Sequence, residues 1–268
     1  MHCKLLYTLL LTAALCIQVQ QTSAQESKIP KVIQRSYIGF NYLANSAKYE
    51  GSLREYFVVP VASGDTSKWY TDHPVNETVR TKMGYGMTIG TFFPLTNFGG
   101  NTSALALSVE FTYNYMQWKQ VDGSIYDQFG WNFFNASGAT VQMGLPIGLD
   151  VKFGGEATTS NNHLLSAGFG AGIIPMQSLT SFEDNASTAS SINPYIRMDG
   201  AIKAGILLKV RLQYTIGGPK YINEEGSLFG SFYEEYTTKT TVTGKGSFAA
   251  SLILYPFSWA WPEHGWWQ

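Results

Sequence analysis

Side-chain type alternates strictly over residues 141–153, which read V-Q-M-G-L-P-I-G-L-D-V-K-F. Every second residue is apolar, and the residues between them are polar, small or charged. A period of two predicts a β-strand with two unlike faces. The stretch is longer than an ordinary strand of about five or six residues, and it suits the roughly nine to eleven residues that a tilted strand needs to cross a bilayer.

The same alternation recurs along the chain and predicts wall strands of a closed, antiparallel, up-and-down transmembrane β-barrel. The expected strands cover residues 37–43, 82–92, 104–115, 141–153, 165–175, 194–203, 206–216 and 242–257, and the two faces of the last are not distinct. The links after the first, third, fifth and seventh strands are long, at about 48–80, 120–137, 177–192 and 217–240. The other links are short, and this asymmetry, with an even strand count, is typical of bacterial barrels with periplasmic turns and larger outer loops.

The two ends of the chain complete the predicted organisation. Lys4, an apolar core at residues 5–17 and small residues up to Ala24 indicate a cleaved N-terminal signal peptide. Cys3 and Cys16 both lie inside it, so we expect no disulfide and no thiolate ligand in the mature chain. The expected segments are a signal peptide at 1–24, a periplasmic lead at 25–34, an outer-membrane β-barrel at 35–257 and a periplasmic aromatic tail at 258–268.

Composition agrees with a barrel and excludes one class of partner. Mean hydropathy is −0.07, which is expected where only alternate residues face lipid, and aromatic residues make up 15% of the chain. The net charge of −1 argues against nucleic acid as a partner. We expect outer-membrane lipid to surround the wall, and four tryptophans of the tail to form a periplasmic interfacial belt. These are Trp259, Trp261, Trp266 and Trp267.

On these strands the chain resembles the small eight-stranded outer-membrane barrels of the OmpA/OmpX type. The resemblance is carried by the strand segment Leu145-Pro146-Ile147-Gly148-Leu149 and by a last strand that ends in Leu254-Tyr255-Pro256-Phe257, and it spans about residues 35–257. It implies a porin-like membrane protein of the bacterial cell envelope and, because such folds host many activities, little about chemistry. Two features depart from the pattern: Pro146 lies within a wall strand, and the chain continues beyond Phe257.

The predicted strands divide their side chains between lipid and lumen. The residues expected to face lipid are Leu105, Leu107, Val109, Phe111, Leu145, Ile147, Leu149, Val151, Leu208, Val210 and Leu212. The charged residues expected to fill the lumen are Glu110, Asp150, Lys152, Arg197, Asp199, Lys203, Lys209 and Arg211. An eight-stranded barrel is just wide enough to be filled by side chains, so these charges predict a paired network that plugs the interior, and a narrow ion path is the alternative.

Candidates for chemistry are few, and we expect no enzymatic activity, no cofactor and no metal. His73 lies in the first predicted outer loop near Ser67 and Asp72, which would suit a lipid-modifying barrel enzyme, but the spacing matches no hydrolytic motif. No acidic ligand loop for calcium is present. Exposed aromatic residues favour recognition surfaces, so the loop residues Tyr126, Trp131, Phe229 and Tyr233 are candidates for binding an extracellular partner.

The sequence therefore predicts an integral outer-membrane barrel with a structural or loop-based binding role. Two alternatives remain at this point. One is an outer-membrane lipid-modifying enzyme that uses His73. The other is a soluble, lipocalin-like periplasmic barrel, which would bind an apolar ligand inside and turn residues such as Glu110 and Arg211 outward.

Overall fold

The structure, a computed structural model, describes residues 29–60, 66–99, 102–119, 138–160, 162–182, 185–229 and 234–262. The strands in these ranges are β1 (Tyr37–Pro60), β2 (Thr66–Phe98), β3 (Ser103–Trp118), β4 (Gly138–Gly144), β5 (Ile147–Gly154), β6 (Leu165–Phe182), β7 (Asn185–Ala204), β8 (Ile206–Ile216), β9 (Lys220–Phe229) and β10 (Glu234–Tyr255). Short helical turns accompany them, namely α2 (Lys31–Gln34), α3 (Gly155–Thr158) and η2 (Ser258–Ala260). Within the described ranges, no helix has the length and apolar character needed to cross a membrane.

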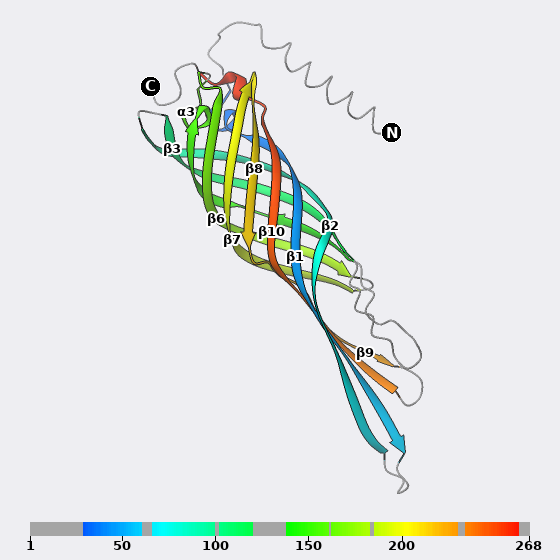
Figure 1. The fold of residues 1–268 in the computed structure, drawn as a ribbon. Coiled ribbons are helices and arrows are strands. Elements are labelled where there is room, and N and C mark those ends of the chain that lie inside the picture. Colours follow the sequence, from blue (N-terminus) through cyan, green and yellow to red (C-terminus); the bar gives the residue numbers. More distant parts are fainter. Residues whose placement is uncertain are drawn as a thin grey trace, which may run out of the picture.

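The sheet closes on itself. Neighbouring strands are antiparallel, and β1 pairs with both β2 and β10, which completes the ring (Figure 1). β4 and β5 share one wall position because each pairs with β3 and β6. β8 and β9 also share one, since both pair with β10, at different ends of that strand. The described strands fill eight wall positions, so the predicted closed antiparallel barrel of eight strands is confirmed.

The gap between β4 and β5 is caused by Pro146. The backbone N–H of Glu110 donates to the Pro146 carbonyl over 2.9 Å, and that of Leu145 donates to the Pro175 carbonyl over 2.9 Å. Proline has no N–H, so the Glu110–Pro146 pair keeps only one of the two hydrogen bonds of such a pair. The register with β3 is the same on both sides of the gap, so the wall continues there without a bulge.

Much of what we predicted as outer loop is strand. β1 and β2 stay paired as far as Pro60 and Thr66, and β6 and β7 as far as Phe182 and Asn185. Residues 217–240 contain β9 and the start of β10. The loop prediction was wrong for these three segments because it relied on apolar alternation, and polar and charged residues are frequent along them. The fourth predicted loop, 120–137, lies outside the described residues.

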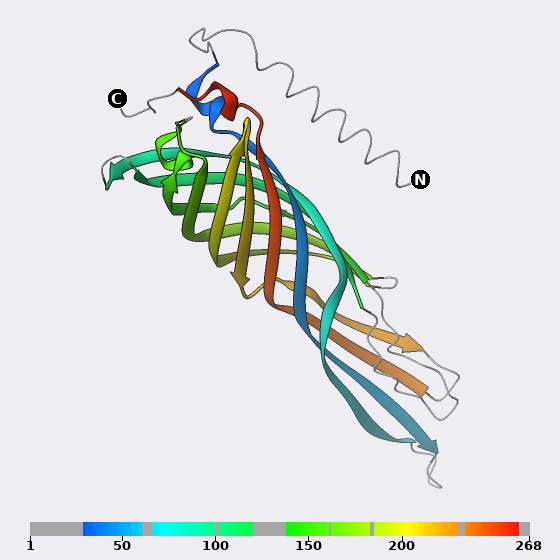
Figure 2. The same ribbon diagram turned by 45° about the horizontal axis from the view of Figure 1, so that its top comes forward.

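Four strands continue past the rest of the barrel and form what we call the outer sheet. It consists of residues 66–80 of β2, 47–60 of β1, 234–243 of β10 and 220–229 of β9, in that order. Figure 1 shows these strands extending away from the barrel at its lower end. Figure 2 shows α2 and η2 together at the opposite end. An even number of wall strands brings both ends of the described chain to that side.

An apolar cluster fills the barrel at the end that carries α2 and η2. Its buried members are Tyr37, Phe92, Ala106, Leu207, Ile253, Tyr255 and Trp261. This cluster explains why the faces of the last strand were not distinct in the sequence. Ser251, Ile253 and Tyr255 point inward while Phe248 and Leu252 are exposed outside, so apolar residues occupy both faces at this level.

The tail takes part in this cluster, and the predicted interfacial belt was wrong for Trp261. That side chain is 2% exposed, and its Nε1 donates a hydrogen bond to the Gln34 carbonyl over 2.9 Å. The chain turns back through η2 after β10, which carries Trp261 over the barrel mouth rather than along the wall. Trp259 is exposed, whereas Trp266 and Trp267 lie outside the described residues.

The two faces of the wall differ in chemistry. Phe111, Leu149 and Val210 are 47%, 50% and 56% exposed on the outside, whereas Glu110 and Asp150 are only 3% and 2% exposed inside. The remaining residues predicted to face lipid are all exposed or half-buried on the outer side; they are Leu105, Leu107, Val109, Leu145, Ile147, Val151, Leu208 and Leu212. A closed wall with an apolar outside and a charged inside is the arrangement of a transmembrane β-barrel.

Candidate functional site

Charged side chains inside the barrel form one closed cycle of alternating sign, which we call the charge ring. In order around the cycle its members are Asp150, Arg197, Glu110, Arg211, Asp199, Lys209, Glu156 and Lys152. They come from β3, β5, α3, β7 and β8, and none is more than 9% exposed. The cycle joins four carboxylates to four cations, and this balance offsets the high cost of burying ionised groups.

The arginine half of the charge ring is built from charge-assisted hydrogen bonds. Arg197 contacts both oxygens of Asp150, with Nε–Oδ1 and Nη2–Oδ2 distances of 2.9 and 2.6 Å, and its Nη1 lies 2.5 Å from Glu110 Oε1. Arg211 donates from Nη1 to the same Glu110 oxygen over 2.7 Å and from Nε to Asp199 Oδ1 over 2.8 Å. The planar guanidinium fork fixes the orientation of each carboxylate as well as neutralising it.

The lysine half closes the cycle. Lys209 Nζ lies 2.5 Å from Glu156 Oε1 and 3.2 Å from Asp199 Oδ2. Lys152 donates to the same oxygen of Glu156, and its Nζ is 3.7 Å from Asp150 Oδ2. Burial alone would raise the pKa of Glu156, which lies in α3 outside the strands, but Lys152 and Lys209 lower it below its usual value. Glu156 therefore stays ionised at neutral pH.

The apolar cluster forms a floor under the charge ring. The hydroxyl groups of Tyr37 and Tyr255 donate to Glu110 Oε1 over 2.5 Å and to Glu156 Oε1 over 2.6 Å. The ammonium group of Lys152 lies 4.6 Å from the centroid of the Phe92 ring, within the range of a cation–π contact. The aromatic side chains thus anchor two carboxylates of the charge ring from one side.

Glycine gives the charge ring its space. A Cβ atom on Gly170 of β6 would lie 1.9 Å from Asp150 Oδ1, and one on Gly90 of β2 would lie 2.7 Å from Glu110 Cγ. Neither position could carry a larger side chain without displacing a ring carboxylate. The inward glycines of β2 and β6 are therefore part of what positions the charges.

The structure groups the predicted lumen residues differently from the prediction in two respects. Seven of the eight lie in the charge ring, but Lys203 does not: its Nζ donates to the Ser258 carbonyl over 3.0 Å and lies 4.8 Å from the Trp261 ring centroid. Sequence reasoning missed Glu156, which we assigned to a polar turn and which α3 folds inward. A signal was available, because the predicted set held three acids and five bases, and a buried network with that imbalance lacks a carboxylate.

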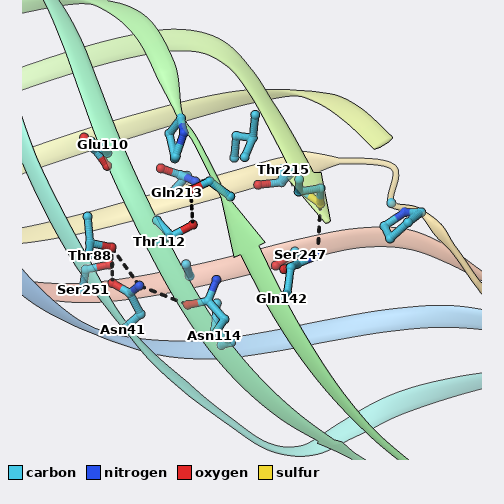
Figure 3. Close-up of a pocket in the computed structure, with 18 of the residues that line it drawn as sticks. Asn41, Thr88, Glu110, Thr112, Asn114, Gln142, Gln213, Thr215, Ser247 and Ser251 are labelled. Atoms are coloured by element: carbon cyan, nitrogen blue, oxygen red, sulfur yellow. Dashed lines mark hydrogen bonds between the residues drawn. The ribbon is translucent and has the colours of Figure 1, made fainter. Parts of the chain in front are cut away.

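A small cavity lies against the charge ring, on the side of the outer sheet. Figure 3 shows Glu110 together with polar side chains such as Asn41 and Gln213 in its lining. Its volume is about 40 Å³, and its lining includes Glu110 and Arg211. Asn41 Nδ2 donates to Thr88 Oγ1 over 2.8 Å and to Asn114 Oδ1 over 3.2 Å across one wall of the cavity. A space of this size holds a few water molecules and no organic ligand, so the interior here is not a binding chamber.

The remaining candidate residues lie toward the outer sheet. His73 is in β2, paired with Leu53, rather than in a loop. Ser67 lies six residues before it on the same strand, which separates the two backbones by about 20 Å. The strand backbone therefore does not place Ser67 next to His73.

The predicted binding residues of the loops are mostly beyond what the structure describes. Tyr126, Trp131 and Tyr233 lie outside the described residues. Phe229 is the last residue of β9 and pairs with Glu235 of β10. Among the described residues, no group of three or more His, Cys, Asp and Glu side chains is placed to hold a metal ion.

Comparisons with known proteins find distant structural similarities and no sequence match. No protein-family model matches the sequence, and no curated protein matches it. The outer membrane protease OmpT from Escherichia coli is similar at 8% identity and a TM-score of 0.38, over 85% of this chain and 99% of that chain. Neisserial surface protein A is similar at 10% identity and a TM-score of 0.31, over 78% and 98% of the two chains. The attachment invasion locus protein Ail of Yersinia pestis is similar at 9% identity and a TM-score of 0.29, over 75% and 98%.

Proposed function

We propose that this protein is an integral β-barrel of the bacterial outer membrane, with a sealed lumen and a binding role carried by the outer sheet. The observation that carries the proposal is the division of the wall: Phe111, Leu149 and Val210 face outward, while the charge ring closes the centre. In water this arrangement would expose a wide apolar belt, whereas in a bilayer the exposed apolar side chains of the wall meet hydrocarbon.

The same division argues against the two alternative functions. A lipocalin-like barrel needs an apolar chamber, but this interior holds paired charges and a cavity of about 40 Å³. A lipid-modifying enzyme that uses His73 needs a nucleophile beside it, and a single strand keeps Ser67 away from it. We therefore propose a non-enzymatic role. The resemblance to the OmpA/OmpX type remains a prediction about family.

The outer sheet supports the proposed binding role. It presents paired backbone well beyond the apolar belt, and its polar surface includes the exposed residues Asp72, Asn76 and Glu77. A strand framework holds its surface in one shape, so contact with a partner costs less ordering than contact through a free loop. The partner is expected to bind outside the cell, at the end of the barrel opposite α2 and η2.

Single-cysteine labelling in whole cells tests both the location and the orientation. Asn76→Cys should react with a membrane-impermeant maleimide in intact cells, because Asn76 is exposed in the outer sheet. Val32→Cys, exposed at 47% in α2 at the other end, should react only after the outer membrane is permeabilised. The mature chain is expected to contain no cysteine of its own. Labelling of Val32→Cys alone in intact cells would reverse the orientation, and recovery in the soluble periplasm with no heat-dependent gel shift would refute the proposal.

A further inference from the structure

Exposed cations gather on the outside of the wall where the barrel passes into the outer sheet. They are Arg80 and Lys82 of β2, Lys119 directly after β3, and Lys245 of β10, and we call them the cationic collar. Lys82 and Lys245 are the extra residues at two bulges, since the pairing passes from Thr81 to Met83 in β2 and from Gly244 to Gly246 in β10. Bulges redirect side chains, and here each bulge places a lysine on the outer surface.

Strand pairing places the cationic collar in one row. Ser46 of β1 pairs with both Gly246 and Arg80, and the backbone N–H of Lys119 donates to the Arg80 carbonyl over 2.9 Å. The row therefore crosses β10, β1, β2 and β3, a width of three strand spacings or about 15 Å. Positive charge is concentrated on this side of the barrel, because the facing segments 138–144, 176–182 and 185–193 of β4, β6 and β7 contain no charged residue.

The residues that the structure describes do not neutralise the cationic collar. In the part of the chain that the structure describes, none of its four members forms an ion pair with a carboxylate, and Lys245 Nζ donates to Thr78 Oγ1 over 2.9 Å. Glu50 is paired with Lys48 over 2.6 Å. Glu77 shares the face of the buried Val79, which is opposite to that of Arg80. An external anion can therefore approach the collar.

Along β1–β3, the outer surface next to the cationic collar changes from charged to aromatic to apolar side chains. Tyr42, Tyr85 and Tyr115 pair across β1, β2 and β3 as one row, with the rings of Tyr85 and Tyr115 5.4 Å apart. Tyr85 is three residues from Lys82, which is about 10 Å along the strand. On the other side of the tyrosines lie exposed apolar residues such as Phe40 and Ile89. Hydrocarbon, interface and headgroup levels thus follow one another along the same three strands.

We propose that the cationic collar binds the phosphate headgroup of an anionic lipid in the outer leaflet, whose acyl chains lie along the apolar wall of β1–β3. This inference rests on the proposed membrane location and adds a lipid site with a defined ligand chemistry. Lys and Arg side chains near an anionic membrane surface attract its headgroups, and the tyrosine row below them sets the depth. The occupant is a membrane lipid rather than a soluble anion, because the site continues directly into the lipid-facing wall.

Native mass spectrometry of the full chain tests the proposal. The protein is reconstituted in vesicles of equal parts phosphatidylcholine and phosphatidylglycerol, extracted in mild detergent, and scored for the ratio of the two lipids that it retains. Wild type should retain phosphatidylglycerol preferentially, and the variant R80Q/K82Q/K119Q/K245Q should lower this preference at least about tenfold. The matched control K82R/K119R/K245R keeps every charge and should behave as wild type. Folding of the glutamine variant is checked by its heat-dependent gel shift. If the folded variant retains the two lipids in the wild-type ratio, the proposal is overturned.

Two further arms separate the other outcomes. In the first arm, inorganic phosphate is added to the lipid-free protein in detergent. If phosphate binds as strongly as the lipid and this binding is lost in the glutamine variant, the site belongs to a soluble anion and the lipid site is overturned. Insertion is also measured in pure phosphatidylcholine. Insertion without any later preference for phosphatidylglycerol would refute the collar site and leave the membrane proposal standing, whereas failure to insert would refute both.

Discussion

The charge ring and the cationic collar contain the same number of cations, but these cations differ in burial and in pairing with carboxylates. The ring cations Lys152, Arg197, Lys209 and Arg211 are buried, and each contacts a carboxylate. The collar cations Arg80, Lys82, Lys119 and Lys245 are exposed and, in the described part of the chain, have no carboxylate partner. Burial makes an unpaired charge very costly, whereas water at the surface makes pairing nearly worthless. Charges with a structural role are therefore balanced here, and charges left unbalanced are free to bind an external anion.

The largest effect on stability is expected when the charge ring is unbalanced. Glu110→Gln removes the carboxylate that joins Arg197 to Arg211 and leaves both guanidinium groups undercompensated inside the barrel. We expect a loss of about 3–5 kcal/mol in the free energy of unfolding. The measurement is urea unfolding in phosphatidylcholine vesicles, followed by the loss of the fast-migrating folded band on an unboiled gel.

The matched control is Glu77→Gln, which removes an exposed carboxylate from β2. Its effect should stay within about 0.5 kcal/mol because surface substitutions away from special contacts change stability little. Equal effects of the two variants would show that the charge ring is not dehydrated, and the contrast between buried and exposed charge would fail.

The same contrast between burial and exposure can be tested with tryptophan at the end that carries η2. Trp261→Ala removes a side chain that is 2% exposed and packed against Tyr255, with ring centroids 5.9 Å apart. We expect a loss of about 3 kcal/mol in the free energy of unfolding because a cavity replaces the aromatic ring. Trp259→Ala, at a position 47% exposed and two residues away, should cost less than about 1 kcal/mol. The same unfolding measurement applies, and a larger loss from Trp259→Ala would contradict the structure.

The sequence predicted the wall because a strand in a bilayer must alternate. Leu149 and Asp150 are neighbours that have to face opposite media, so hydrophobicity alone reveals the strand and both of its faces. The outer sheet has no such signal. Polar and charged residues are frequent along its strands, as at residues 48–80, so composition does not distinguish these long strands from loops.

The charge ring was predictable in part. Residues on regular strands, such as Arg197 and Arg211, follow from the period of two. Glu156 does not, because its direction is set by α3, a single turn of helix outside that period. The roles of Tyr37 and Tyr255 could not be predicted for a related reason. A tyrosine side chain has an apolar ring and a polar hydroxyl group, so it can lie on either face of the wall. Only the packing shows that these two hydroxyl groups anchor carboxylates.

A smaller effect should appear when charge balance is restored. Arg197→Gln combined with Glu110→Gln removes one cation together with one carboxylate from the charge ring. The double variant should be more stable than the sum of the two single losses predicts, with a coupling of about 1–3 kcal/mol, because each substitution removes part of the imbalance left by the other. A double-mutant cycle from the four unfolding curves measures it. Strict additivity would mean that Asp150 and Arg211 accommodate the changes independently, and that the ring is not one cooperative unit.

The smallest effect on stability is expected from substitutions in the cationic collar. In phosphatidylcholine vesicles, R80Q/K82Q/K119Q/K245Q should change the free energy of unfolding by no more than about 1 kcal/mol in total, because these exposed side chains have no carboxylate partner in the described structure. Adding phosphatidylglycerol should stabilise the wild type and leave this variant unchanged, since a ligand that binds only the folded state raises its stability in proportion to the logarithm of occupancy. A large loss in phosphatidylcholine alone would make the collar a structural element like the ring, and an equal gain from phosphatidylglycerol in both proteins would place the lipid effect elsewhere on the wall.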